Sequence, residues 1–405
     1  MTLFAASLAG FVLLCFTAEL LCRTVLHLHF DPYSFPLGRE HFPDFMHLRG
    51  RFAYFHSREF FTYDDGSAYL YPAPVALVYK AFYGFGAHAV RAFVGWIALC
   101  AGAAWLGMGR LLQRRGVGRA GAYLVPLLVL CCSYPLWTDV RQANMEIVIA
   151  LFTSLGIAFF LDDQEYPAAV CFGLAASMKI YPAILLALFL ARRRIGPMVL
   201  GALTAALCTV AGLWAVCPDI RTSWRFIRAG VLRFRTDYIL VRRPEIGTDH
   251  SLFAWVKLAL RPLPDAHLLG HYLTAYLAIA GVTATVLFFV RIVKLPAANQ
   301  VLLLSIATIL LPPVSFEYTL LNMLAPIGML VLLSVDAHQS GNTLRWEAIL
   351  FGCSAVILAP LPEFIVRGWT IDGQIKSVAL AIMFVCALRG PLALPAADRG
   401  TPIKQ

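Results

Sequence analysis

Residues 197–216 are PMVLGALTAALCTVAGLWAV, twenty mainly apolar residues without a charged side chain. A helix that crosses the hydrocarbon core of a bilayer needs about 20 such residues. Three arginines, Arg192–Arg194, stand just before this stretch, and basic residues beside a membrane segment mark its cytoplasmic side. The stretch therefore predicts a membrane-spanning helix and gives that helix a direction.

The whole chain of 405 residues shares this character. It is 60% hydrophobic and 14% charged, with a mean hydropathy of +0.73, whereas soluble domains have about 25% charged residues. So few charges cannot cover a water-exposed globule of this size, and the composition indicates an integral membrane protein. It excludes a disordered chain, a coiled coil and a secreted disulfide scaffold, since ten cysteines are few for this length.

Apolar segments of membrane-helix length recur along the chain and predict roughly eleven to thirteen transmembrane helices. We expect an all-α polytopic fold that forms a single domain at residues 1–390, followed by a cytoplasmic tail at 391–405. A shorter apolar stretch at 75–85 fits a re-entrant or interfacial helix. The expected segments are 3–22, 88–108, 120–137, 145–161, 166–179, 180–191, 197–216, 269–293, 299–315, 318–334, 346–363 and 374–388.

Basic residues in short loops set the orientation. The positive-inside rule places these loops on the cytoplasmic side, and both termini then fall there too. The loop at 162–165 is acidic and falls on the same side. Two long loops, 23–73 and 217–268, lie outside, and we expect a bacterial inner (plasma) membrane. The orienting residues are Arg110, Arg114, Arg115, Arg119, Arg192–Arg194, Arg291, Lys294, Arg345, Arg389, Arg399 and Lys404.

Unusual polar residues converge on the expected outer side, which is typical of a site built at that interface. Asp44 lies in the first outer loop, near the aromatic stretch Phe52–His56. A carboxylate in this place could deprotonate an acceptor hydroxyl, and a solvated loop aspartate is the alternative. Further along, Asp64–Gly66 indicates a turn rather than a metal site.

A second polar group is the run Thr138–Glu146, which enters an otherwise apolar helix. Burial of such groups is costly unless they are paired, so we expect them to face a wet cavity and one another. A polar lock between helices is the alternative for Asn144 and Glu146.

Lys179 lies between apolar runs, next to the helix-breaking Pro182. A lysine there can snorkel to the interface or bind a phosphate. Broken helices at membrane depth usually line a cavity, which favours the phosphate.

The second outer loop carries a surplus of arginines. Arg221, Arg225 and Arg228 recur at helical spacing beside Trp224, which predicts an amphipathic helix at the membrane surface. The helix would attract anionic headgroups or capture a lipid-linked phosphate, with Asp249–Ser251 facing the same site.

Nucleotide and metal motifs are absent from the sequence. It contains no Walker A motif, no nucleotide-binding glycine fingerprint, no HExxH and no CxxC. A cytosolic nucleotide donor is therefore not expected, and neither is a metal, a cofactor or a nucleic-acid partner.

Taken in order, these motifs resemble the polyprenyl-phosphate-mannose-dependent mannosyltransferases of the GT-C class, glycosyltransferase family 87, which includes mycobacterial phosphatidylinositol-mannoside mannosyltransferase. The resemblance covers residues 1 to about 335. Asp44 stands at the position of the family's catalytic aspartate. The other matching elements are Tyr71, Pro72 and Pro74; Gln142 and Asn144; Lys179, Tyr181 and Pro182; and Ser251 with Leu252.

Three positions depart from the family pattern. Asp249 stands where asparagine is usual, and His250 stands where glutamine is usual. Ser315, Phe316 and Glu317 resemble a Ser-Trp-acidic motif that many members continue with histidine, but Tyr318 follows here.

The resemblance implies an inverting transfer of a hexose, mannose in the family, from a polyprenyl monophosphate to a lipid or glycan hydroxyl at the outer face. Asp44 would be the general base, with membrane lipids around the site. Substrate contacts would come from Tyr71, Gln142, Asn144, Ser251 and Glu317, and donor-phosphate contacts from Lys179, Tyr181, His250, Arg225 and Arg228.

Two other functions fit the composition. A polytopic transporter or lipid-carrier flippase would place ionisable residues near mid-span in both halves, whereas here they cluster at outer helix ends. A non-catalytic membrane protein that shares the fold is the other alternative.

Overall fold

The structure, a computed structural model, describes residues 2–25, 42–63, 69–240, 244–260, 266–361, 365–366 and 369–392. Within this part the fold is helical, as predicted, apart from one two-stranded hairpin in which β1 (Ile365–Val366) pairs antiparallel with β2 (Trp369–Thr370). The expected turn at Asp64–Gly66, and Arg399 and Lys404 of the expected tail, lie outside the described residues.

The first half of the chain forms helices that include most of the polar motifs. They are α1 (Thr2–Thr24), α2 (Pro43–Leu48), η2 (Arg49–Tyr54), α3 (Glu59–Thr62), α4 (Ala73–Tyr83), η3 (Gly86–His88), α5 (Ala89–Arg114), α6 (Arg119–Cys131), α7 (Tyr134–Gln142), α8 (Glu146–Leu161), α9 (Glu165–Met178), η4 (Tyr181–Leu186), α10 (Ala187–Ala191) and α11 (Ile195–Val216).

The second half begins with the arginine-rich segment. Its elements are α12 (Ile220–Phe234), η5 (Arg235–Ile239), η6 (Pro244–Thr248), α13 (Leu252–Ala259), α14 (Ala266–Val290), η7 (Ile292–Lys294), α15 (Ala297–Leu310), η8 (Glu317–Met323), α16 (Leu324–Gln339), α17 (Glu347–Leu358) and α18 (Asp372–Arg389).

Each of the twelve expected apolar segments contains helix in its described residues, but the helices differ in length. Among the described residues, four helical stretches are long and apolar enough to cross a membrane: 86–114, 195–216, 266–294 and 317–339. The pair α6 and α7 adds a fifth if its 53° bend lies within one span. Five shorter apolar helices accompany them. The protein is thus a polytopic membrane protein, and the count of eleven to thirteen crossings stays a prediction.

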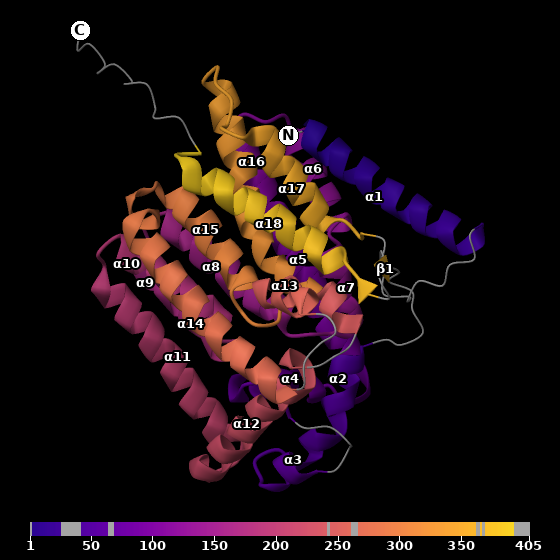
Figure 1. Ribbon diagram of the computed structural model, residues 1–405, viewed down its shortest axis with the longest axis vertical. Coiled ribbons are helices and arrows are strands. Elements are labelled where there is room, and N and C mark those ends of the chain that lie inside the picture. The colour runs from indigo at the N-terminus through magenta and orange to yellow at the C-terminus, as the bar shows by residue number, and fades with distance from the viewer. Residues whose placement is uncertain are drawn as a thin grey trace.

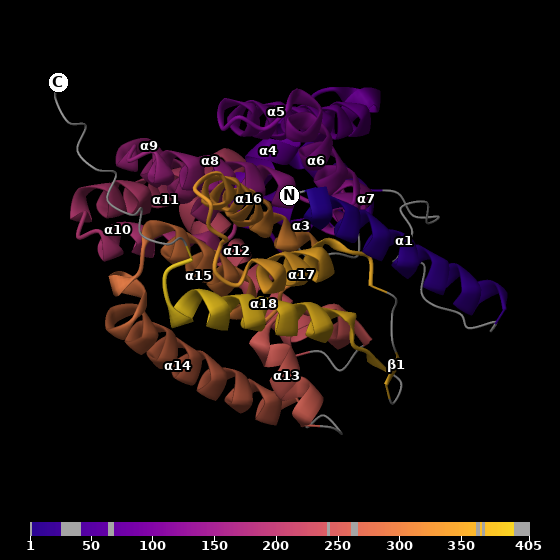
Figure 2. The same cartoon turned by 90° about the horizontal axis from the view of Figure 1, so that it is seen from above.

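The long helices expose apolar side chains that a bilayer would cover. Leu207 and Val210 of α11 are 68% and 50% exposed, and Ile279 and Val282 of α14 are 67% and 65% exposed. Apolar patches on this scale are unusual on soluble monomers. Figure 2 shows α5 and α14 at opposite edges of the bundle, with α15, α16 and α17 between them.

Loops expected on the cytoplasmic side are joined by ion pairs at one end of the bundle. Arg192 lies 2.7 Å from Asp163 and 3.8 Å from Glu165, so the acidic loop pairs with the basic one. Arg115 lies 2.8 Å from Asp336 at the end of α16. The short elements α2, α3, α4 and α12 gather at the lower end of the molecule in Figure 1.

An aromatic core fixes α2 at this lower end. Phe45 is fully buried, with its ring centroid 4.5 Å from that of Tyr83 and 5.3 Å from that of Phe93. The Tyr83 hydroxyl donates to the Phe45 carbonyl. Because aromatic pairs add about 0.5–1.5 kcal/mol beyond their burial, the residue next to Phe45, Asp44, is held in a defined place.

Candidate functional site

Two strained turns bring Asp44 and Asn144 together. Phe42, at the N-cap of α2, has φ 61° and its amide donates to the Arg141 carbonyl at 2.8 Å. Ala143, which ends α7, has φ 51°, and its carbonyl accepts from the Tyr79 hydroxyl at 3.3 Å. Left-handed backbone costs of order 1–3 kcal/mol in a non-glycine residue and concentrates at functional sites.

Asp44 is held by two polar neighbours. Asn144 donates from Nδ2 to Asp44 Oδ2 at 2.6 Å, and the same nitrogen lies 3.3 Å from the Tyr71 hydroxyl. The Tyr71 hydroxyl is itself a hydrogen-bond partner of the Asp44 carboxylate. Together, these contacts orient one carboxylate that lies outside the membrane-spanning segments.

The pKa of Asp44 is raised above its ordinary value because burial disfavours the carboxylate. The hydrogen bond from Asn144, the positive charge of Lys179 and the hydrogen bond from Tyr71 lower this pKa and limit the rise. A carboxylate with a raised pKa is a better proton acceptor, which suits a general base.

Lys179 points inward instead of snorkelling. Its Nζ lies 2.6 Å from Glu146 Oε2 and 3.4 Å from Asn144 Oδ1. It also lies 4.8 Å from the centroid of the Tyr318 ring, which it faces as a cation–π partner. Asn144 therefore links the carboxylate of Asp44 to the ammonium of Lys179.

Glu146 is the buried anchor of this group. It accepts from the Tyr181 hydroxyl and, at 2.7 Å, from Asn322 Nδ2. Asp139, from the same polar run, is fully buried and interacts electrostatically with Glu146, Lys179 and Asp44. Glu146 thus has the helix-locking role that was the alternative for it, whereas Asn144 reaches Asp44.

Asp249, His250 and Ser251 form a buried joint and do not face an open site. All three are at most 1% exposed. Asp249 Oδ1 accepts from the amides of Ser251 and Ser315, both at 2.9 Å. Ser251 caps α13 through a 3.1 Å bond from the Ala254 amide. This joint fastens the start of α13 to the segment before η8.

His250 joins a buried ionic group whose third member, Lys376, is not among the residues predicted from the sequence. Its ring contacts the Ser315 carbonyl at 3.0 Å and Glu317 Oε2 at 3.2 Å. Lys376 of α18, 1% exposed, pairs with the other oxygen of Glu317. The one signal in the sequence was a lysine inside the apolar run 374–388. η8 connects the two groups, since Glu317 lies in one and Tyr318 and Asn322 lie in the other.

The remaining predicted residues lie at the edge of the site. Gln142 ends α7 and is half-buried. Arg225 and Arg228 lie on the exposed side of α12, which confirms the predicted amphipathic helix, and neither pairs with a residue around Lys179 in the described part of the chain. A row of rings runs from η5 to Tyr318: Tyr238 to Phe316 at 6.4 Å, and Phe316 to Tyr318 at 5.9 Å.

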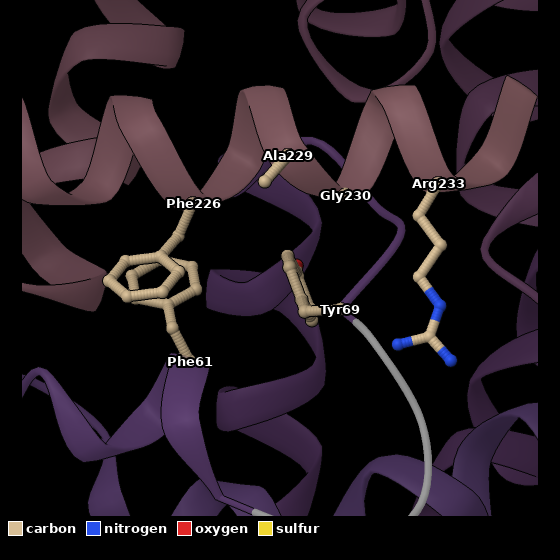
Figure 3. A pocket seen from close by; sticks show the side chains of 6 residues that line it. All are labelled: Phe61, Tyr69, Phe226, Ala229, Gly230 and Arg233. Carbon is tan, nitrogen blue, oxygen red and sulfur yellow. The ribbon is translucent and has the colours of Figure 1, made fainter.

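Two cavities flank α12. One, with a volume of about 170 Å³, lies between α3 and α12 (Figure 3). The other, of about 260 Å³, is an apolar groove between α12, η5 and α14. Its lining includes Leu232, Ile239, Leu273, Leu277 and Pro313, together with Arg235.

A metal centre is not visible in the described ranges: no group of three or more His, Cys, Asp or Glu side chains there could hold an ion.

Comparison with known proteins identifies the family. The family profile for glycosyltransferase family 87 matches residues 69–311, a range that contains Tyr71, Asn144, Lys179 and Ser251. Asp44 precedes this range, and Glu317 and Lys376 follow it. No curated protein and no solved structure gives a match. The transporter and flippase alternatives therefore lose their support: since the profile covers more than half of the chain, the protein belongs to glycosyltransferase family 87.

Proposed function

We propose that the protein transfers a hexose, mannose by its resemblance to the mannosyltransferases of the family, from a polyprenyl monophosphate to a hydroxyl of a lipid or glycan. The observation that carries the proposal is the contact series Asp44–Asn144–Lys179, with donor–acceptor distances of 2.6 and 3.4 Å. It sets a proton acceptor beside a cation, the two groups that a single displacement at an anomeric carbon requires.

In this mechanism Asp44 accepts the proton of the acceptor hydroxyl. The hydroxyl oxygen forms a bond to the anomeric carbon from one face while the bond from that carbon to the phosphate oxygen breaks on the other. The anomeric centre is inverted, and the electron pair of the broken bond stays on the polyprenyl phosphate. Lys179 offsets the charge of this leaving group at the moment of transfer.

Lys179 alone is a weak electrostatic partner for a phosphate because Glu146 already pairs with it. Arg235 of η5 supplies a second cation: it lines the apolar groove and forms no ion pair with any residue in the described ranges. We assign the phosphate to Lys179 and to Arg235, which lines the groove, in place of Arg225 and Arg228, which do not line it.

The groove between α12 and α14 would hold the polyprenyl chain. Its walls are apolar except for Arg235 and Thr274, and one wall is α14, which is long and apolar enough to cross the membrane. A chain could enter this groove from the bilayer while its phosphate stays at Arg235. The low charge of the walls favours a hydrocarbon over a nucleotide.

The proposal places α2, α3 and α12 on the outer side of a bacterial inner membrane, with both termini cytoplasmic. The clustered arginines of the opposite loops support this orientation. The inferred mechanism assigns no step to a metal or cofactor.

The test uses purified protein in lipid nanodiscs with radiolabelled polyprenyl-phosphate-mannose and membrane lipids, with and without EDTA. We expect a labelled product that survives EDTA, and its loss in Asp44→Asn, which changes a charge but little shape. Removal of a general base lowers the rate by about 10²–10⁴-fold. A labelled product from GDP-mannose, or normal turnover by Asp44→Asn, would overturn the proposal.

A further inference from the structure

The segment η8 carries residues of two buried ionic groups. Glu317, its first residue, pairs with Lys376 of α18 and, at 3.2 Å, with the ring of His250. Tyr318 follows directly in the chain, and the centroid of its ring lies 4.8 Å from Nζ of Lys179. One short segment therefore connects the last helix to a cation that we assign to the leaving phosphate.

A second contact joins η8 to the same cation. Asn322 donates from Nδ2 to Glu146 Oε1 at 2.7 Å, and its Oδ1 accepts from the Thr153 hydroxyl of α8 at 2.8 Å. Glu146 in turn pairs with Lys179 at 2.6 Å. A shift of η8 would therefore disturb two neighbours of Lys179, the Tyr318 ring and the Glu146 carboxylate.

Lys376 reaches across to η8 and not along its own helix. Asp372 lies one turn earlier on α18, at a spacing that suits an ion pair within a helix. Among the described residues, however, Lys376 forms no ion pair with Asp372, and Asp372 Oδ1 has no hydrogen-bond partner. The lysine instead contacts Glu317 and lies 5.2 Å from the centroid of the Tyr134 ring of α7.

The first turns of α18, which carry Lys376, are closely fitted to their neighbours. A Cβ at Gly373 would lie 2.7 Å from a backbone oxygen of η6. Gln374 donates to another backbone oxygen of η6 at 2.7 Å, and Trp255 of α13 donates to Ser377 at 2.7 Å. Figures 1 and 2 both show α13 alongside α18. Lys376 thus extends from a fixed base.

The pair of Lys376 and Glu317 fixes a position more than it adds stability. Burial of two charges has a desolvation cost, so an apolar pair of similar volume often stabilises a fold as well or better. Directional contacts are what the charged pair provides. Glu317 is 8% exposed, with one oxygen toward Lys376 and the other toward His250, and these contacts hold the start of η8 in one place.

We infer that Lys376 is a positioning residue for transfer: through Glu317 it holds η8 where the Tyr318 ring sets the ammonium of Lys179 for the leaving phosphate. The inference rests on the proposed function, because it takes Lys179 as a cation of the leaving group. Glu317 and Lys376 follow residues 69–311, so the match to the family profile does not include their contact.

The first test measures the surroundings of Lys179 without a substrate. The chain has six lysines, so ¹³C labelling of lysine Cε in the full-length protein in nanodiscs gives few NMR signals. Lys179→Met identifies the signal of Lys179. We expect its Cε protons upfield of those of the exposed Lys294, because the Tyr318 ring faces Lys179. Tyr318→Leu removes the ring and should move the signal downfield.

The variant that tests the inference combines Lys376→Met with Glu317→Gln, which removes both charges of the pair and avoids a stranded carboxylate. We expect the Lys179 signal to move downfield in this double variant, as in Tyr318→Leu. The matched control combines Arg115→Met with Asp336→Asn, an ion pair at the other end of the bundle. The control should leave the Lys179 signal in place.

The second test is a double-mutant cycle on kcat/KM for polyprenyl-phosphate-mannose, measured per folded protein. A misplacement of about 1 Å can lower a rate about 10²-fold, so we expect a roughly tenfold to hundredfold fall in the Lys376→Met, Glu317→Gln variant and in Tyr318→Leu. Both changes act through Lys179, so their combination should fall no further than the lower of the two. Independent effects would multiply.

The outcomes separate this inference from the proposed function. An unmoved Lys179 signal in the Lys376→Met, Glu317→Gln variant would overturn the inference, and so would losses that multiply when Tyr318→Leu is added. A signal that moves, in a protein that transfers no hexose from any polyprenyl phosphate, would support the coupling and refute the function. Transfer that depends on Asp44, with an unmoved signal, would support the function and refute the coupling.

Discussion

Asn144 donates a 2.6 Å hydrogen bond to Asp44 although the two residues are 100 positions apart in the chain. The same side chain accepts from Lys179 at 3.4 Å through its Oδ1. An amide can do both because it carries a donor and an acceptor at once. Asn144 thus holds the proposed base, Asp44, and the proposed phosphate-binding cation, Lys179, in fixed positions relative to each other.

Replacing Asn144 should change both the rate and its pH dependence. For a general base, kcat/KM falls as pH drops through the pKa of the carboxyl, here raised above the ordinary value of 3.8. Asn144→Ala removes a hydrogen bond that lowers this pKa, so the acid limb should move to higher pH. Asn144→Asp adds a like charge and should move it further. A bond to a charged group contributes about 1.5–3 kcal/mol, so kcat/KM should fall roughly tenfold or more.

The measurement is the pH profile of kcat/KM for the three proteins. Asn342→Ala, an exposed asparagine in the loop after α16, is the control and should match wild type. An acid limb that stays in place in both Asn144 variants would show that Asp44 is not the group that titrates.

Lys179→Met should destabilise the protein because it leaves the buried carboxylate of Glu146 without its cation. Loss of one partner of such a pair costs about 3–5 kcal/mol. The double variant Lys179→Met with Glu146→Gln removes both charges and should regain most of the stability, as measured by thermal unfolding. It should not regain transfer, because the leaving phosphate still lacks its cation. Transfer restored in the double variant would assign Lys179 a purely structural role.

Gly230→Ala should loosen the packing of α12 against Tyr69. The added Cβ would lie 2.2 Å from a backbone oxygen, which no side-chain rotation can relieve. Overpacking of this kind costs about 1–3 kcal/mol. Gly281→Ala on α14 is the matched control, since a Cβ there meets no atom within 4 Å. It should be neutral or stabilising by up to about 1 kcal/mol through helix propensity. The thermal unfolding midpoints of the two variants are compared. Equal midpoints would contradict the close approach of Gly230 to the Tyr69 backbone.

Lys376→Met should lower stability by about 3–5 kcal/mol, since it strands the buried carboxylate of Glu317. Adding Glu317→Gln should restore most of the lost stability. A double-mutant cycle of unfolding midpoints measures the coupling between Lys376 and Glu317. Lys294→Met changes an exposed lysine and should stay within about 0.5 kcal/mol of wild type. If Lys376→Met unfolds at the wild-type midpoint, the pair with Glu317 does not stabilise the fold.

Local features of the sequence predict much of this protein. Apolar windows identify the helical segments because burial in lipid depends on the composition of each stretch alone. The spacing of Arg221, Arg225 and Arg228 predicts α12 because helical periodicity, too, depends only on residues near one another in the chain. Asp44, Asn144 and Lys179 stand out in the sequence because polar groups are costly in apolar surroundings.

Packing between distant segments decides the rest. The residues next to Lys179 in the chain give no sign that it pairs with Glu146. Those next to His250 give no sign that it contacts Glu317, which pairs with Lys376. The two cavities beside α12 exist only because α3 and α14 lie against its different faces. The amino-acid order alone is enough to predict a helical membrane protein with candidate polar residues. Which of those residues meet depends on contacts between residues as far apart as Asp44 and Asn144, 100 positions, which only the folded chain brings within hydrogen-bond distance.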